Sequence, residues 1–281
     1  MSTSYVRFVN TSLPEVNQIN SIGFVPDPKL EIQLGNYENV STGSIYGHAQ
    51  LQTAVSWVSV SPTPAPKVLP LIPAPGIACA LSYEHVGGAV DTTTQIVIEC
   101  YETDTDTSTV TKVVTLDDIN KVTIPGTIYR IKNMFVNPGG PAVVGTGNIY
   151  IYDDTLVPVL GVPADYFDIM KFSLFGDPDY ANLRETAIYY SPPGTTTYAH
   201  NIQISTNNEV ITKSLSFEIV LNENHTWHFT FYPGQGLFIY NEPFIEISPG
   251  VTVHLKARAP ATAVSCPITF TMDLLVYTPP P

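Results

Sequence analysis

Histidine is the natural starting point for chemistry, because imidazole is both a common metal ligand and a general base near neutral pH. The chain contains 6 histidines, of which His225 and His228 are the closest pair. Residues three apart share a face on a helix, whereas on a strand they point to opposite faces. The surrounding HTWHFTFY alternates as a strand does, so we do not expect this pair to bind one metal ion. The other histidines have no carboxylate or thiol at metal-site spacing: His48, His85, His200 and His254.

Two short carboxylate clusters are the best candidates for binding a cation. Asp153 with Asp154, and Asp177 with Asp179, could supply oxygen ligands. Neither cluster has the stepped Asp and Asn positions with a closing Glu that build a calcium loop. We interpret both as turn-forming residues and keep calcium binding as the alternative. Residues 102–106, ETDTD, are predicted by the same reasoning to form a solvated hairpin turn.

Glycine-rich segments at residues 139–140 and 145–147 could cradle a phosphate. A phosphate loop needs a following Lys-Ser or Lys-Thr and the N-terminus of a helix, and here the next predicted element is a strand. The Gly-x-Ser-x-Gly motif of serine hydrolases does not occur either. The sequence therefore predicts no catalytic residue, no cofactor and no metal site, and we expect the protein not to be an enzyme.

The 3 cysteines, Cys79, Cys100 and Cys266, are far apart and odd in number. A secreted protein that depends on disulfides uses a denser, even set. Cys79 and Cys100 could be neighbours in a sheet, and we expect them to be buried free thiols. The N-terminal MSTSYVRFVNTSLPEVNQ has no apolar segment typical of a signal peptide. No window approaches the roughly 18 apolar residues of a membrane span, so we expect folding in a reducing cytoplasm.

Charge limits the partners that the protein can bind. The net charge is −13, with only 12 basic residues, and nucleic-acid binding needs clustered Lys and Arg. We therefore expect no nucleic-acid partner. Charged residues make up 13% of the chain, about half of the roughly 25% usual in soluble domains. Such a surface is typical of proteins covered by neighbours, although a β-protein covered by Thr and Ser would have the same composition.

Strand patterns dominate the chain, and helical periodicity is almost absent. Residues 164–175 alone could form a helix, and the pattern leaves helix and non-helix equally open. Residues 95–101 are apolar and β-branched, which predicts a strand buried on both faces. Residues 251–258 alternate apolar with polar side chains, which predicts one buried and one solvated face. Trp57 is the expected core anchor of the strand around it.

A proline-rich loop is expected at residues 61–76. The surrounding VSVSPTPAPKVLPLIPAPGI cannot be a central strand, because each proline removes a ladder hydrogen bond. An extended arm lying on a surface is the plain interpretation. Exposure of its apolar side chains would be unfavourable, so they pack either within the chain or against a neighbouring subunit: Val68, Leu69, Leu71 and Ile72.

Strands joined by Asp, Asn and Gly turns predict antiparallel sheets rather than parallel βαβ units. We predict an all-β protein of two antiparallel, jelly-roll-like β-sandwiches with a proline-rich arm or loop. The predicted divisions are an N-terminal extension at 1–42, a first sandwich at 43–155, a linker or insert at 156–184 and a second sandwich at 185–281.

Several segments together carry a resemblance to known proteins. They are SIGFVPDP (21–28), QIVIE (95–99), VVTL (113–116), YRI (129–131), GTGNIYI (145–151), IYYSPPG (188–194) and PFIEISPGVTVHLKA (243–257). In this order they resemble virion structural proteins of tailed phages and large algal DNA viruses. The likeness covers residues 21–277, with departures in the proline arm (62–75) and in an irregular insert (156–183). It implies a capsid or other virion component and no catalytic residues.

These observations predict a structural component of a double-stranded DNA virus particle. The expected role is a minor capsid or vertex (penton-type) protein that holds neighbouring subunits by shape-complementary contacts. Its expected partners are other capsid proteins and copies of itself, and its expected location is the virion, assembled in the host cytoplasm. The first alternative is a glycan- or receptor-binding spike or fibre protein, since 16 Tyr and 2 Trp suit sugar stacking. The second is a cellular β-sandwich binding module or enzyme.

Overall fold

The computed structural model describes residues 37–51, 57–62, 67–85, 90–141, 145–172, 184–206, 215–222, 225–231, 237–239, 245–258 and 266–280. Every helix or strand assigned in these ranges is a strand, and all paired strands run antiparallel. The predicted all-β class with antiparallel sheets is therefore confirmed.

The strands follow one another along the whole described chain. The earlier ones are β1 (Val40–Leu51), β2 (Val58–Ser59), β3 (Ile77–His85), β4 (Gln95–Tyr101), β5 (Val110–Thr115), β6 (Val122–Ile128), β7 (Arg130–Val136), β8 (Gly147–Asp153) and β9 (Asp168–Phe172). The later ones are β10 (Ile188–Tyr190), β11 (Thr196–Thr206), β12 (Leu215–Leu221), β13 (His225–Phe231), β14 (Leu237–Ile239), β15 (Ile245–Ile247), β16 (Thr252–Arg258) and β17 (Cys266–Tyr277).

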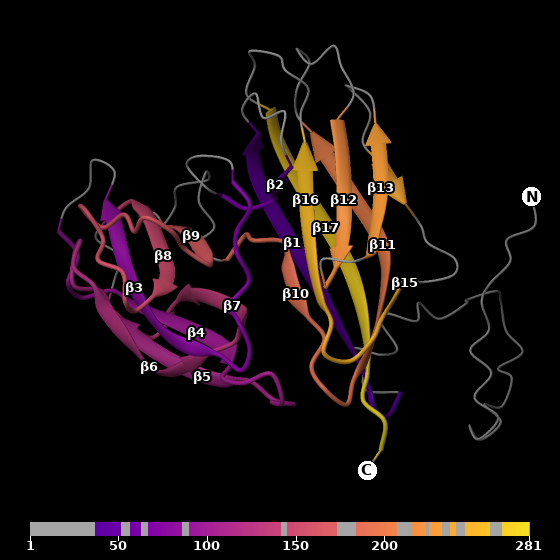
Figure 1. Cartoon of the computed structure of the whole chain (residues 1–281), viewed down its shortest axis with the longest axis horizontal. Coiled ribbons are helices and arrows are strands. Elements are labelled where there is room, and N and C mark those ends of the chain that lie inside the picture. The colour runs from indigo at the N-terminus through magenta and orange to yellow at the C-terminus, as the bar shows by residue number, and fades with distance from the viewer. Residues whose placement is uncertain are drawn as a thin grey trace, which may run out of the picture.

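Four sheets pair around two main hydrophobic cores, and the two resulting bodies lie side by side (Figure 1). Sheet β1-β17-β11-β14, with β15, and sheet β10-β16-β12-β13, with β2, share one core that contains Phe270 and Phe217. Sheets β6-β3-β8-β9 and β5-β4-β7 share the other, which contains Leu81 and Ile98. We call the first pair the terminal unit and the second pair the inserted unit, because β3 to β9 interrupt the chain of the terminal unit.

The pairing in the terminal unit is nested. β12 pairs with β13, β11 with β14 and β15, β10 with β16, and β1 with β17. These are the pairings of one long hairpin. Two further pairings, β11 with β17 and β12 with β16, join the strand pairs of this hairpin into two sheets. The terminal unit is therefore a long antiparallel hairpin that is rolled up so that its two halves enclose a core.

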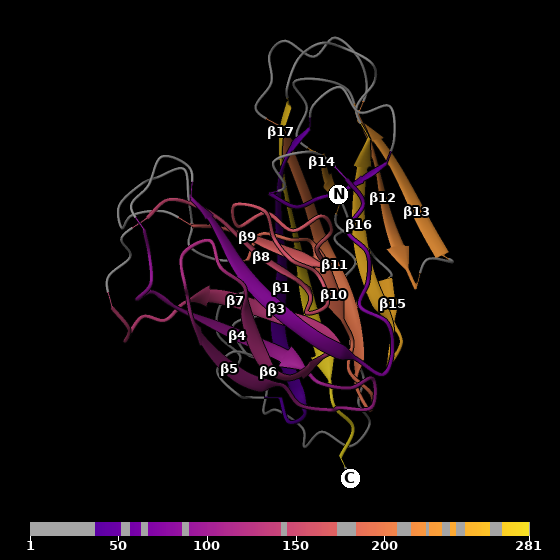
Figure 2. The ribbon, with the colours of Figure 1, turned by 60° about the vertical axis from the view of Figure 1, so that its left-hand side comes forward.

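Long-range pairing moves two of the three predicted domain boundaries. Residues 43–51 were expected in the first sandwich, yet β1 pairs along its length with β17 at the other end of the chain. Residues 156–184 were expected to be a linker, yet β9 pairs with β8 and completes a sheet of the inserted unit. The terminal unit is thus built from both ends of the described chain (Figure 2).

The possible helix at residues 164–175 is wrong for its described part, residues 164–172. Asp168–Phe172 form β9, because the edge of β8 offers a complete row of hydrogen-bond partners from Gly147 to Ile151. Ile169 and Met170 are both fully buried, the first in a small cluster near the proline segment and the second in the main core. Burial on both faces therefore explains an apolar pattern that alternation alone leaves ambiguous.

Alternation succeeds where one face of a strand meets solvent. In β17 the buried side chains are Ile268, Phe270, Met272 and Leu274, and the intervening ones are only partly buried. The prediction that β4 is buried on both faces is confirmed, since Ile96, Val97, Ile98 and Cys100 are all buried. Trp57 is not the core anchor: it is half-buried and lies beside Arg258 and His228.

Candidate functional site

The contact between the two units is the most elaborate polar and aromatic arrangement that the structure describes. A shallow, open hollow with a volume of only about 20 Å³ marks this seam, and residues of both units line it. Apolar side chains from the proline segment and from each unit form most of its wall, with two arginines and one carboxylate between them: Pro70, Leu71, Ile72, Tyr129, Arg130, Ile131, Phe167, Asp168, Arg184 and Ile188.

Three tyrosines join the units at one part of the seam. Tyr101 and Tyr129 come from the inserted unit, and Tyr190 comes from β10 of the terminal unit. The Tyr190 ring meets the other two edge-on, with centroid distances of 5.1 Å and 5.4 Å, the geometry that aromatic quadrupoles favour. The Tyr190 hydroxyl donates to the carbonyl of Asp104 at 3.0 Å. Burial raises the pKa of Tyr190 to about 12, so this hydroxyl remains a neutral donor.

Arg130 crosses the seam next to these rings. Its guanidinium lies 4.0 Å from the centre of the Tyr129 ring and donates to the backbone carbonyl of Ile72. Its Nε donates to the hydroxyl of Thr252 in β16 of the terminal unit at 3.0 Å. One side chain thus binds the inserted unit, the proline segment and the terminal unit.

A buried ion pair lies where the chain leaves the inserted unit. Arg184 Nε and Asp168 Oδ2 are 2.6 Å apart, and the two side chains are only 7% and 2% exposed. Asp168 also accepts from the hydroxyl of Thr186 at 2.7 Å. Arg184 donates to the carbonyl of Ile188 at 3.0 Å. The pair therefore fixes the start of β10 to β9.

The proline segment, residues 61–76, lies within this seam and contains no strand in its described part, as predicted, whereas Val58 and Ser59 just before it form β2. Leu69 is 1% exposed and Ile72 is 4% exposed, each in a cluster with residues of the inserted unit. Of the two arrangements open from the sequence, packing within the chain is therefore the one found for these two side chains. Val68 remains 46% exposed.

A serine–histidine pair, which sequence spacing could not reveal, lies under the proline segment. Ser59 Oγ and His254 Nε2 are 2.7 Å apart although 195 residues separate them. The same serine oxygen accepts the backbone N–H of Leu69 at 2.7 Å, and the tautomer of His254 decides which side chain donates in the serine–histidine bond. Ser59 is 1% and His254 4% exposed, and burial lowers the pKa of His254 to about 3. A serine that no substrate reaches and a histidine of such low basicity do not form a nucleophile and base. The pair holds the proline segment on β16.

The solvated face predicted for β16 is consequently wrong at two positions. Thr252 is 2% and His254 is 4% exposed, because Arg130 and Ser59 cover them. Lys256 and Arg258, further along the same face, are partly buried and exposed, as predicted. Thr252 therefore marks a contact with the inserted unit, and His254 marks a contact with β2 and the proline segment that follows it.

His254 should make stability depend on pH. Its pKa is near 6.5 in the unfolded chain and about 3 in the folded protein, so below pH 6.5 the unfolded state binds a proton that the folded state does not. Each unit of pH below that point removes roughly 1.4 kcal/mol. Urea unfolding should therefore show a loss of about 2 kcal/mol between pH 7.5 and pH 5.0 that the H254Q variant lacks. Equal losses in both proteins would contradict the assignment.

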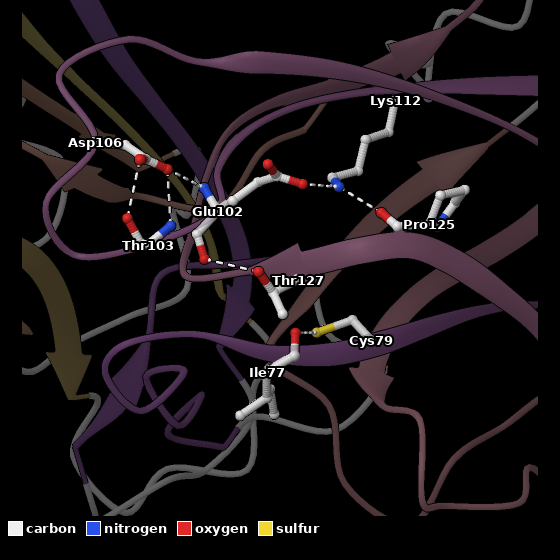
Figure 3. A network of polar contacts seen from close by, with 8 residues as sticks. All are labelled: Ile77, Cys79, Glu102, Thr103, Asp106, Lys112, Pro125 and Thr127. Atoms are coloured by element: carbon white, nitrogen blue, oxygen red, sulfur yellow. Dashed lines mark hydrogen bonds and ion pairs between the residues drawn. The ribbon is translucent and has the colours of Figure 1, made fainter.

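The acidic run at residues 102–106 forms the turn between β4 and β5, as predicted (Figure 3). Asp106 accepts from the backbone N–H groups of Glu102 and Thr103, both at 2.8 Å, and from the Thr103 hydroxyl at 2.9 Å. These bonds hold the pKa of Asp106 below its usual range. Glu102 binds Lys112 Nζ at 2.6 Å, and Lys112 also donates to the carbonyl of Pro125. Asp106 therefore stabilises the turn, and Glu102 forms an ion pair with Lys112 on β5.

Asp153 and Asp154 also have partners within the chain. Asp153 accepts from the backbone N–H and the hydroxyl of Thr155 at 2.8 Å and 2.7 Å. These bonds lower the pKa of Asp153. Asp154 accepts from the Thr123 hydroxyl at 2.9 Å and lies 3.6 Å from Lys121 Nζ. Both act as the turn residues that the sequence indicates. Asp177 and Asp179 lie outside the described residues.

The histidine side chains that the structure describes, His48, His228 and His254, are not brought together. β13 contains His225 and His228, as its alternation predicts, and His228 Nδ1 lies 3.8 Å from Glu218 on β12. His48 Nδ1 lies 3.8 Å from Glu185, and burial lowers the pKa of His48. The side chains of His85, His200 and His225 lie outside the described part of the chain.

Cys79 and Cys100 are buried and free, as expected, and burial raises their pKa to about 12 and about 11. They are not neighbours in one sheet: β3 and β4 belong to different sheets and turn both thiols into the same core. The side chain of Cys266 is outside the described residues.

The described ranges contain no group of three or more His, Cys, Asp and Glu side chains placed to hold a metal ion. Within the same ranges, no helix has the length and apolar character needed to cross a membrane. What the described residues do bring together is a polar and aromatic joint between two β-units. Sequence reasoning missed this joint, and only the abundance of tyrosine hints at it.

No protein-family model matches the sequence, and no curated protein matches it. Among solved structures, the chain shows weak similarity to particles and the VP2 protein of infectious bursal disease virus. Particles described as derived T=1 particles match at 11% identity over 86% of this chain and 74% of theirs, with a TM-score of 0.18. The Gt strain matches at 11% identity over 85% and 72%, with a TM-score of 0.19. At these TM-scores the likeness does not reach a shared fold and carries no argument about the topology or the function of this chain.

Proposed function

We propose that this protein is a structural component of a virus particle and that its terminal unit is a jelly roll. The nested pairing carries this proposal: a hairpin rolled into two facing sheets is the arrangement of strands that defines a jelly roll, a fold used by viral capsid proteins and also by lectins and cupins. The inserted unit enters the chain between β1 and β10. It decorates the jelly roll without breaking the pairing.

The outer face of the β1-β17-β11 sheet supports a role in assembly. Hydroxyl-bearing side chains alternate with the buried ones along β1 and β17, and Tyr46 and Tyr277 are 43% and 39% exposed. The carboxylate on β17, Asp273, accepts a hydrogen bond from Asn201 at 2.8 Å. A surface of hydroxyl groups and aromatic rings loses less solvation on contact than a charged one. It therefore suits lateral packing against another subunit.

In finer detail, we propose a minor capsid or vertex protein of a double-stranded DNA virus that acts by shape and not by catalysis. Its partners would be other capsid proteins and copies of itself, within virions assembled in the host cytoplasm. The contacts of the seam supply the fixed shape that this role requires. Because Arg130, Tyr190 and the Asp168–Arg184 pair join the units, both present their surfaces as one block. Contacts then gain roughly 25 cal/mol per Å² of apolar area before the entropy of association is subtracted.

The test is assembly of the purified full chain. Sedimentation velocity and negative-stain electron microscopy across a range of concentrations should show rings, capsomers or closed particles. Electron microscopy of intact virus particles should also locate the density of this chain. A protein that stays monomeric throughout, or that turns over a substrate at an enzyme-like rate, would contradict the proposal. Glycan binding that depends on Tyr46 and Tyr277, without assembly, would favour the spike alternative.

A further inference from the structure

An unusual turn projects from the connection between β8 and β9. Val159 and Val162 exchange two backbone hydrogen bonds, of 2.9 Å and 3.0 Å. They enclose Leu160 and Gly161, whose φ angles are +52° and +82°. Two central residues with positive φ make a type I′ turn, where Asn-Gly is the favoured sequence. Leucine is rarely found in this conformation.

The side chains of this turn are also unusual. Val157, Val159 and Leu160 are 77%, 74% and 73% exposed, the largest exposures among the large apolar residues of the described chain. Backbone conformation favours Asn at position 160, and contact with water favours polar groups at all three positions. The sequence of this turn departs from both preferences. Such departures are expected at functional sites.

The turn is seated firmly on the inserted unit. A Cβ atom at Gly161 would lie 2.0 Å from the backbone oxygen of Tyr83, so only glycine permits this approach. The Ser82 hydroxyl donates to the Gly161 carbonyl at 2.8 Å. Leu156 and Val162, at the base, pack against a buried cluster. The three apolar side chains are therefore presented on a preformed support, so contact with a partner loses little conformational entropy.

We propose that this apolar turn, residues 157–162, docks against a second copy of the chain, as one repeated contact of the assembly proposed above. The inference rests on that structural role. Segment 153–170 carries four aspartates and no Lys, Arg or His, so it does not suit an anionic membrane or a nucleic acid. A partner of the same kind must be approached through uncharged groups, because each copy carries a net charge of −13.

The size of the turn also points to a repeated contact. Three side chains cover far less than the roughly 1,000 Å² that an isolated specific interface needs. In a ring or shell, each copy both offers its turn and receives one, so several small contacts act together. The turn therefore fits a contact that closes an assembly better than one that holds an isolated pair.

The experiment uses the L160N and V157T/V159T/L160N variants of the full chain, with V113T as the matched control. Asn suits the left-handed backbone, and Thr retains the branched shape of Val, so both turn variants should fold at least as stably as the wild type. Val113 is also exposed, at 51%, but lies on β5. Sedimentation velocity should show association weakened at least about tenfold in the triple variant, less in L160N, and unchanged in V113T.

The outcomes separate this inference from the proposed function. If the wild type assembles and the triple variant assembles equally well, the turn is not a contact, although the structural role survives. If the wild type itself never assembles, the structural role fails and this inference falls with it. If the wild type binds phosphatidylcholine vesicles through this turn without assembling, the partner is a lipid surface, which overturns the assignment to a second copy.

Discussion

The R184M variant should lose about 3–5 kcal/mol of unfolding free energy, measured by urea titration. Arg184 and Asp168 form an ion pair in which both side chains are almost fully buried. Without the guanidinium, Asp168 retains the Thr186 hydroxyl and the backbone N–H of Ile169, but its charge lies in a medium of low polarity without a counter-ion. Breaking one side of a buried pair typically has this large effect.

Two variants distinguish this effect from a general loss of charge. K121M removes the cation of an exposed pair, in which Lys121 Nζ and Asp154 Oδ1 are 3.6 Å apart, and should lose less than about 1 kcal/mol. The double variant R184M/D168L removes both buried charges and should recover much of the stability lost in R184M. A double variant as unstable as R184M would show that packing, rather than the unpaired charge, dominates the effect.

Short-range patterns predicted the strands because one face of a strand must be apolar wherever the other meets solvent. The alternation of β17 from Ile268 to Leu274 follows from this rule, and the apolar run Ile96–Ile98 in β4 indicates burial on both faces. The turn at residues 102–106 follows as well, since Asp and Thr side chains readily bond to the adjacent backbone. These features depend only on neighbours in sequence.

The partners of the strands could not be predicted in the same way. β1 alternates like any half-buried strand, but nothing in its residues indicates pairing with β17 instead of β3. The domain boundary drawn before residue 43 failed for this reason. β9 shows the same limit at an edge: Asp168–Phe172 carry a pattern that either a helix or a doubly buried strand would satisfy, and the free edge of β8 selects the strand.

The seam was missed because its polar residues suggest solvent when considered one strand at a time. Thr252 and His254 occupy the polar positions of β16, and only Arg130 and Ser59, more than a hundred residues earlier in the chain, make those positions buried. Tyr101, Tyr129 and Tyr190 are likewise buried where the two units meet. A polar residue on a strand therefore indicates either solvent or another covering segment of the chain, and the topology decides between them.

Replacing Tyr190 with alanine should lower the unfolding free energy by about 3–5 kcal/mol, the range for truncating a buried aromatic residue. Tyr190 is 5% exposed and is the terminal unit's member of the tyrosine cluster. Its ring contacts both Tyr101 and Tyr129 edge-on, so the variant leaves those two rings facing a void. Small-angle scattering should show a broader distribution of distances between the units, because this anchor of their relative orientation is lost.

The Y190F variant retains the ring and removes only the hydroxyl that donates to Asp104. Its expected loss is about 0.5–1.5 kcal/mol, the usual contribution of one hydrogen bond, and scattering should match the wild type. If Y190A and Y190F lose equal free energy, the hydroxyl and not the stacked rings holds the seam. If Y190A is destabilised but keeps the wild-type scattering profile, Arg130 and the Asp168–Arg184 pair suffice to orient the units. Assembly of Y190A then separates the two roles: a protein that works as one rigid block should assemble only while that orientation is kept.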